Sequence, residues 1–264
     1  PPPAPRRPPA PQTPAPRAAP CGAPLLPGRL ICRQPEHGYR FSVDAVLAAH
    51  FARPAATDRV LDLGCGCGVI GLILAHRCPD LTVFGLEVQA DLAALAADNA
   101  RQNGFADRMR VIRGDVRAIG ELLAAESFDL VVANPPYRSL GSGRLSDHDQ
   151  AARARHELHG DLVDFVRAAA FAVRNRGRAV FVYPALRTAT LLAVLPNHRL
   201  TPRRLQPVIA WPGAPSARLA LVEAVKNGGE GFEIQSPLPI DAARGGGPSA
   251  ELQAMYAEAP CSPG

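Results

Sequence analysis

The chain has 264 residues, of which 47% are hydrophobic and 20% are charged. This balance is typical of a folded globular protein and excludes fibrous and wholly disordered classes. The formal net charge of +5 equals the number of arginines that precede the first acidic residue, Glu36, so it is weak evidence that the folded part binds nucleic acid. No apolar run reaches the roughly 18 residues of a membrane span, and the N-terminus lacks the apolar core of a secretory signal. We therefore expect a cytoplasmic protein without a membrane partner.

Three regions follow from composition. Residues 1–24 are mostly Pro, Ala and Arg, which predicts a disordered tail. Residues 25–226 carry the apolar stretches of one domain, which begins with an entry segment over 25–57. Residues 227–264 are rich in Gly and Pro and predict a loosely ordered tail, although Leu252, Met255 and Tyr256 are spaced as in a short docking helix.

Within the domain, short apolar stretches alternate with helical ones. Strands are expected at 59–63, 81–86, 109–113, 128–133 and 179–183, with two more near 200–209 and 219–225. Helices are expected at 69–77, 90–102 and 162–175. This order predicts an α/β, Rossmann-like fold, with a mostly parallel seven-stranded sheet and helices on both faces.

A glycine loop follows the first of these strands. Gly64, Gly66 and Gly68 alternate after Asp62, which lets the backbone turn sharply and approach a ligand beside the next helix N-terminus. Gly66, Gly68 and Gly71 also satisfy the dinucleotide fingerprint, and Glu87, about 20 residues on, suits ribose hydroxyls with either cofactor. The loop alone therefore leaves NAD and S-adenosylmethionine open, although an acid before three alternating glycines resembles the first motif of class I methyltransferases.

Two cysteines, Cys65 and Cys67, occupy the variable positions of this loop, and the chain has six cysteines without a CxxC pair. Metal ligation is therefore not expected, and free thiols in a reducing compartment are.

A second motif, Asn134-Pro135-Pro136-Tyr137, follows the apolar stretch 128–133. The alternative is a rigid turn without a catalytic role. At the carboxyl end of a strand, however, the Asn134 amide oxygen and the Pro135 carbonyl suit the two N–H bonds of an aromatic amine, and the prolines fix both acceptors. Tyr137 offers a ring for stacking. This pattern favours transfer of a methyl group to an exocyclic amine.

The whole pattern resembles the bacterial tRNA1(Val) (adenine-37-N6)-methyltransferase family, with Asn-Pro-Pro-Tyr and a segment QPEHGYRFSVDAVL at residues 34–47. The resemblance covers about residues 30–225, and it implies that the entry segment over 25–57 forms a lid, with residues 39–44 folded over the cofactor. It implies S-adenosylmethionine as cofactor, tRNA as partner, a class I methyltransferase fold and a monomer without metal. The implied cofactor contacts are Tyr39, Phe41, Ser42, Asp62, Gly64, Cys65, Gly66, Gly68, Glu87, Asp115 and Asn134. Asn134, Pro135, Pro136 and Tyr137 would hold the adenine.

Three other functions remain open on the sequence alone. The same motif serves methylation of protein glutamine or rRNA guanine, although such relatives usually carry a further N-terminal domain. An NAD-dependent oxidoreductase would need a hydride-transfer site that the sequence does not display. A non-catalytic nucleic-acid-binding module is disfavoured by the two motifs together. Arg203 and Arg204 are candidates for contact with an RNA backbone, and Trp211 is interpreted as a core or edge residue.

Overall fold

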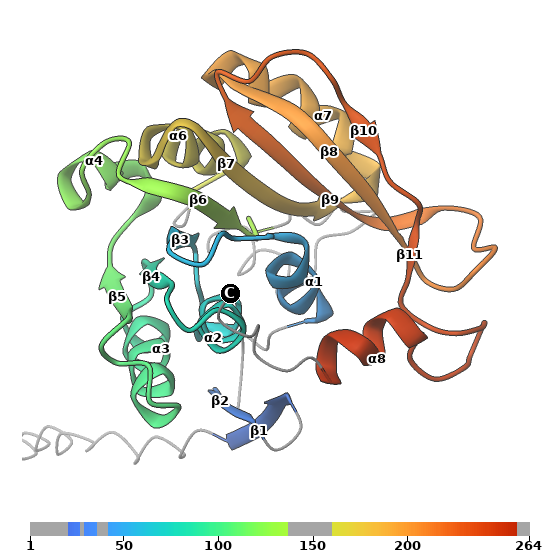
Figure 1. Cartoon of the computed structure of the whole chain (residues 1–264), viewed down its shortest axis with the longest axis horizontal. Helices are drawn as coiled ribbons and strands as arrows, with labels where there is room; N and C mark the ends of the chain where they lie inside the picture. Colours follow the sequence, from blue (N-terminus) through green and yellow to red (C-terminus); the bar gives the residue numbers. More distant parts are fainter. Residues whose placement is uncertain (1–20, 27–28, 36–41, 137–159, 258–264) are drawn as a thin grey trace, which may run out of the picture.

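The computed structural model describes residues 21–26, 29–35, 42–136 and 160–257 (Figure 1). Tyr39, Phe41 and Tyr137 lie outside these residues, as do residues 1–20 of the tail expected over 1–24 and the last residues, 258–264. Residues 21–24 of that expected tail belong instead to a strand, β1 (Cys21–Leu26). Among the described residues, no helix is long and apolar enough to cross a membrane.

The elements alternate along the chain as expected for an α/β protein. The strands are β1 (Cys21–Leu26), β2 (Leu30–Gln34), β3 (Arg59–Leu63), β4 (Thr82–Glu87), β5 (Met109–Arg113), β6 (Phe128–Ala133), β7 (Val173–Pro184), β8 (Leu200–Ile209), β9 (Ala217–Lys226), β10 (Glu233–Ile234) and β11 (Leu238–Pro239). The α-helices are α1 (Val43–Phe51), α2 (Val69–Arg77), α3 (Ala90–Gln102), α4 (Ile119–Leu122), α6 (Leu162–Ala172), α7 (Thr188–Val194) and α8 (Ala250–Ala257). Short 3-10 turns are η1 (Val116–Ala118), η2 (Ala185–Arg187) and η3 (Leu195–His198).

The main sheet has the order β10-β8-β9-β7-β6-β3-β4-β5, and β11 also pairs with β8. Strands β5, β4, β3, β6 and β7 are parallel, whereas β9 runs antiparallel to both β7 and β8. The seven strands from β3 to β9 are those expected from the sequence. The two-residue strands β10 and β11 extend the sheet beyond β8.

Successive residues of each central strand pack on opposite faces of the sheet, and helices cover both of these faces (Figure 1). Val60, Leu130 and Val180 join a core beneath α1 and α2, whereas Leu61 and Val131 join a second core beneath α6 and α7. All five side chains are fully buried. Burial on both faces explains why these strands are apolar at almost every position.

Two features differ from the sequence-based expectations. The helix expected to reach residue 175 ends at Ala172, because Val173 already pairs with Phe128 in the sheet. Residues 227–257 are not a loosely ordered tail: β10 and β11 pair in parallel with β8, and Leu252 of α8 is buried in the first core. The backbone of this Gly- and Pro-rich segment finds its hydrogen-bond partners in β8, although composition alone predicts an unstructured segment.

The N-terminal hairpin β1–β2 was not expected, and side-chain amides of α3 hold it. Asn99 Oδ1 accepts the Arg33 N–H at 2.9 Å, and Asn99 Nδ2 donates to the Arg33 carbonyl at 3.0 Å. One turn later, Asn103 makes the same two bonds with the backbone of Ile31, at 2.9 and 2.8 Å. Asn99 and Asn103, four residues apart on one face at the end of α3, thus hydrogen-bond the backbone of β2 as a neighbouring strand would.

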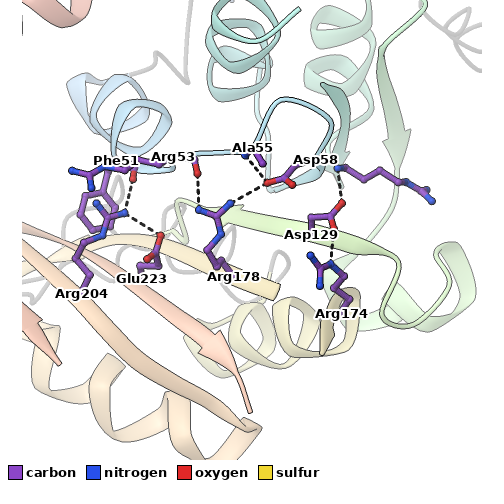
Figure 2. A network of polar contacts seen from close by, with 10 residues as sticks. Phe51, Arg53, Ala55, Asp58, Asp129, Arg174, Arg178, Arg204 and Glu223 are labelled. Carbon is purple, nitrogen blue, oxygen red and sulfur yellow. Dashed lines mark hydrogen bonds and ion pairs between the residues drawn. The ribbon is translucent and has the colours of Figure 1, made fainter. Parts of the chain in front are cut away.

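At the amino ends of the central strands, a polar network joins the α1–β3 connection to the sheet (Figure 2). Arg178 donates to the Arg53 carbonyl and forms an ion pair with Asp58 at 3.0 Å. Asp129 accepts the Arg59 N–H at 2.8 Å and pairs with Arg174. The network fixes the edge of the sheet opposite to the one that carries the glycine loop.

Candidate functional site

The glycine loop lies at the carboxyl end of β3 and turns into α2. Gly64, Gly66 and Gly68 have φ angles of +70°, +57° and +89°, a region that residues with a Cβ rarely adopt. The Gly64 and Cys65 N–H groups both donate to the Leu86 carbonyl, at 2.8 and 3.1 Å. The loop is therefore fixed against β4, and its glycines present bare backbone to the space above the sheet.

The loop cysteines point away from that space. Cys65 is buried and packs on β4, where a Cβ added to Gly85 would lie 2.7 Å from the Cys65 Sγ. The sequence-predicted cofactor contact Cys65 is therefore not among the residues that line the cleft. Burial is the main cause that raises the pKa of the Cys65 thiol well above its ordinary value, with the Asp62 and Glu87 carboxylates adding to it.

Cys67 faces the hairpin, and its Sγ lies 3.7 Å from the Cys32 Sγ. Four cysteines, Cys32, Cys65, Cys67 and Cys78, are free and buried, in line with the free thiols expected. Among the described residues, no group of three or more His, Cys, Asp or Glu side chains is placed to hold a metal ion.

Glu87 ends β4 and lines the cleft, as its position in the sequence predicts. One carboxylate oxygen, Oε2, accepts the Gly66 N–H at 3.0 Å, and Oε1 accepts the Gln89 N–H at 2.9 Å. These bonds fix the carboxylate between the loop and the start of α3. Each oxygen keeps further acceptor capacity, which suits a pair of vicinal hydroxyl groups.

Asp62 lies behind the loop with 1% of its surface exposed, and neither carboxylate oxygen has a hydrogen-bond partner among the described residues. Burial raises the pKa of Asp62 to about 7, and the nearby Glu87 carboxylate adds to it. A buried carboxyl of this kind ionises more readily when a cation lies near it. Asp62 is therefore a carboxyl that holds its proton behind the cleft and does not form part of the cleft wall.

The end of β5 contributes backbone more than side chains. Gly114 and Val116 line the cleft, whereas the Asp115 carboxylate caps η1 through the Arg117 N–H at 2.8 Å and pairs with the Arg117 guanidinium. Asp115 thus lies between two lining residues with its carboxylate engaged by Arg117.

Asn134, Pro135 and Pro136 lie just past β6 and line the same cleft as Gly64, Gly66 and Glu87. Ser42, the N-cap residue of α1, lines it as well and makes no side-chain bond to its own helix. Of the sequence-predicted residues that the structure describes, Asp62, Cys65, Gly68 and Asp115 do not line the cleft. Gly68 instead ends the loop as the N-cap of α2.

This cleft encloses about 300 Å³. Its other lining residues are Asp44, Leu86, Val88, Gln89, Leu92, Gly114, Val116 and Phe165. Three of them, Val88, Gln89 and Gly114, follow a strand end within two residues, so a short extension of each motif would have found them. Asp44 lies in the segment 34–47 that carries the family resemblance, whereas no local signal marks Phe165 of α6.

The residues fit S-adenosylmethionine. The cleft has bare glycine backbone, an acceptor carboxylate at Glu87 and an apolar wall that includes Leu92 and Val116. These features suit a nucleoside with an amino-acid tail. A Cβ on Gly64 would lie 3.1 Å from the Phe165 ring, so a side chain there would narrow the cleft. The unpartnered Asp62 carboxyl suits a positively charged ligand nearby.

A second hollow of about 200 Å³ shares Pro136 with the cleft and lies on its β7 side. Leu162 and Val163 of α6 form one wall, and Tyr183, Arg187 and Thr190 form another. The Asn-Pro-Pro segment therefore separates two adjoining spaces along the carboxyl edge of the sheet.

Comparison with known proteins agrees with this geometry. Residues 42–182 match the family model of the methyltransferase small domain. A tRNA1(Val) (adenine(37)-N6)-methyltransferase of Porphyromonas gingivalis is 31% identical over 68% of this chain and 72% of its own length. A relative with the same description, from Bacteroides fragilis, is 28% identical over 68% and 74% of the two chains.

Two solved structures share the fold. A predicted O-methyltransferase from Agrobacterium tumefaciens has a TM-score of 0.65 at 22% identity, over 82% of this chain and 97% of that one. TrmN from Thermus thermophilus has a TM-score of 0.51 at 22% identity, over 69% and 48% of the two chains.

Proposed function

Because this chain belongs to the small-domain methyltransferases, and among them to the tRNA1(Val) (adenine(37)-N6)-methyltransferase family, we propose that it methylates N6 of adenine 37 in tRNA1(Val). It is an S-adenosylmethionine-dependent N-methyltransferase with a class I fold. The observation that carries the proposal is one shared cleft, in which Asn134 and Pro135 face the glycine loop and Glu87. A tRNA substrate also implies that the enzyme acts in the cytoplasm, and we expect it to act as a monomer.

In this proposal Gly64, Gly66 and Glu87 hold the cofactor, and Ser42 and Asp44 close the cleft from the α1 side. When bound, S-adenosylmethionine supplies an electrophilic methyl group on a positively charged sulfur. The carboxyl of Asp62 and the carboxylate of Glu87 favour that positive charge before transfer.

Asn134 and Pro135 orient the acceptor. The Asn134 amide oxygen and the Pro135 carbonyl accept the two N–H bonds of the exocyclic amine, which turns the nitrogen lone pair out of the ring plane and toward the cofactor. Pro135 and Pro136 have fixed φ angles, so both acceptors are positioned before the substrate arrives. The nitrogen becomes acidic as its new bond to carbon forms, and its proton leaves through these oxygens to solvent. A strong base is not required.

The adenine must leave its stack to reach Asn134. A base in an anticodon loop is already partly unstacked, so moving it out requires less energy than in a duplex. The second hollow beside Pro136 provides space for the acceptor nucleotide on the side away from the cofactor.

The direct test is methyl transfer to transcripts of tRNA1(Val), with nucleoside mass spectrometry to identify the product. We expect N6-methyladenosine with the natural transcript and none when guanosine replaces adenine 37. Transfer to protein glutamine or to rRNA guanine, with tRNA left unmodified, would contradict the proposal.

A variant tests the acceptor role of Asn134. Asn134→Ala is expected to lower kcat at least 100-fold, as removal of one oriented polar group in other active sites does, and to leave the Kd for the cofactor within about threefold. Asn197→Ala is the matched control, since Asn197 lies exposed in η3 away from both hollows. Equal activity of the two variants would remove Asn134 from the mechanism.

A further inference from the structure

Arginines at the amino ends of the strands differ from those at the carboxyl ends in the ion pairs that they form. Towards the amino ends of the strands, each arginine labelled in Figure 2 except Arg53 pairs with an acid. These pairs are Arg174–Asp129, Arg178–Asp58 and Arg204–Glu223. Arg204 is 7% exposed, and Arg203 donates to the carbonyls of Gly229 and Glu230. The expectation that Arg204 contacts an RNA backbone is therefore wrong, because its guanidinium is buried and paired with Glu223. The same expectation for Arg203, which is partly exposed, stays a prediction.

Three further arginines lie where β7 and β8 have their carboxyl ends. Strands β7 and β8 both end at this edge, and β9 begins there, because Leu219 of β9 pairs with both Pro184 and Val208. Arg187 follows β7, Arg218 stands at the start of β9, and Arg244 follows β11. Among the residues that the structure describes, none of these three guanidinium groups forms an ion pair.

An aromatic ring accompanies them. Trp211 directly follows the end of β8 and is partly exposed, and the Arg244 guanidinium lies 5.7 Å from the centre of its ring. Such a stacked pair presents a flat surface and a cation to the same ligand. We call the set Arg187, Arg218, Trp211 and Arg244 the arginine edge.

The arginine edge continues the catalytic cleft. Arg187 lines the hollow that shares Pro136 with the cofactor cleft. From β6 the sheet proceeds through β7 and β9 to β8, three steps of about 4.8 Å each. The edge therefore begins beside the Asn-Pro-Pro segment and extends roughly 14 Å from it to β8. One further step of about 4.8 Å leads to β11, which precedes Arg244.

Asp161 is the acid among the residues that line this hollow with Arg187, and its carboxylate has another partner. Asp161 is the N-cap of α6, and its carboxylate accepts the Asp164 N–H at 3.0 Å. The Asp164 carboxylate in turn accepts the Asp161 N–H at 3.1 Å and pairs with Arg167. The positive charge of Arg187 is thus available to an anion from outside.

We propose that the arginine edge binds the sugar–phosphate backbone and one unpaired base of the RNA whose adenine enters the cleft. This inference rests on the proposed function and specifies how its substrate is held. Guanidinium groups that form no internal ion pair bind phosphates without first breaking one, and an indole ring beside them suits a base exposed in a loop.

The test is tRNA binding at several salt concentrations to wild-type protein and to the triple variant Arg187→Gln, Arg218→Gln, Arg244→Gln. Each lost phosphate contact reduces the slope of log K against log salt by about 0.7 to 0.9. In the triple variant we expect the slope of log K against log salt to decrease in magnitude by about 2. We also expect its KM for tRNA to rise at least 10-fold and its KM for S-adenosylmethionine to stay unchanged. The unchanged cofactor KM and the thermal unfolding temperature report an intact fold.

Arg53→Gln is the matched control, because Arg53 is exposed at the opposite edge. Trp211→Ala is expected to weaken binding several-fold at every salt concentration without changing the slope. If the triple variant and Arg53→Gln have the same slope and KM, the inference is overturned, and methylation of tRNA by the wild type leaves the proposed function in place. If the wild type methylates no tRNA, the proposed function fails, and the slopes still decide whether this surface binds RNA.

Discussion

Asn99 Nδ2 lies 2.9 Å from the backbone carbonyl oxygen of Cys67 and donates a hydrogen bond to it. The same fully buried side chain holds Arg33 of the hairpin through two further bonds. One residue thus connects the N-terminal hairpin to the loop expected to hold the cofactor. Asn103 makes the equivalent pair of bonds to Ile31 but has no bond to the loop.

We expect Asn99→Ala to raise the Kd for S-adenosylmethionine about 10-fold, because the Cys67 carbonyl loses its donor and the loop its support. Leaving buried polar groups unpaired also lowers the free energy of unfolding by about 1–3 kcal/mol. Asn103→Ala removes the second attachment of the hairpin and should leave the Kd unchanged. Calorimetric titration of both variants makes the comparison, and similar Kd values for them would show that Asn99 acts only on stability.

The second prediction concerns the charge at Glu87. Glu87→Gln keeps the size of the side chain but removes the negative charge and one acceptor oxygen of the group that faces the cleft. We expect the Kd for S-adenosylmethionine to rise at least 10-fold, with little change in the KM for tRNA. Glu121→Gln, an exposed site in α4, is the control. A Kd within twofold of wild type would exclude Glu87 from cofactor binding.

The third prediction is the pH dependence of stability that Asp62 imposes. Its pKa is raised to about 7 in the folded protein, whereas the unfolded chain has the ordinary value of about 3.9. Between these values the folded state holds the proton more tightly, so the free energy of unfolding falls as pH rises from about 4 to 7. In Asp62→Asn this contribution disappears.

Unfolding in denaturant at pH 5, 6 and 7 measures this contribution. Without cofactor, the wild type should lose stability relative to Asp62→Asn across this range. With saturating S-adenosylmethionine the difference should shrink, because a bound cation favours the ionised carboxylate. Parallel curves for the two proteins would show that the Asp62 proton is not linked to folding.

The fourth prediction separates buried from exposed ion pairs. Arg204 bonds to Glu223 at 3.0 Å and to the Phe51 carbonyl at 2.8 Å, and its guanidinium lies 3.9 Å from the centre of the Phe51 ring. Glu223→Gln leaves a buried cation without its counter-charge and should lower the free energy of unfolding by about 3–5 kcal/mol. Asp98→Asn, which breaks the exposed pair with Arg101, should change it by at most about 1 kcal/mol. Equal losses in chemical denaturation would contradict this assignment.

The parts of the site that sequence predicts are those determined by neighbours along the chain. The alternating glycines, Glu87 at a strand end and Asn134 before two prolines are local patterns, and all three contribute to one cleft. Phe165 and Asn99 are not predictable in this way, because their roles depend on how helices pack against the loop from a distance in sequence. The same limit explains the error at Arg204, whose partner Glu223 is brought to it by strand pairing.

The contact between Cys65 and Gly85 predicts that substitutions at these two positions are coupled. A methyl group on residue 85 would approach the Cys65 Sγ to 2.7 Å, so Gly85→Ala alone displaces the loop and overpacks the interior by about 1–3 kcal/mol. Exchange of Cys65 for a smaller residue vacates that volume. We therefore expect homologues that carry a larger residue at position 85 to carry a residue smaller than cysteine at position 65. Such covariation would link the shape of the cofactor loop to Gly85, which does not line the cleft.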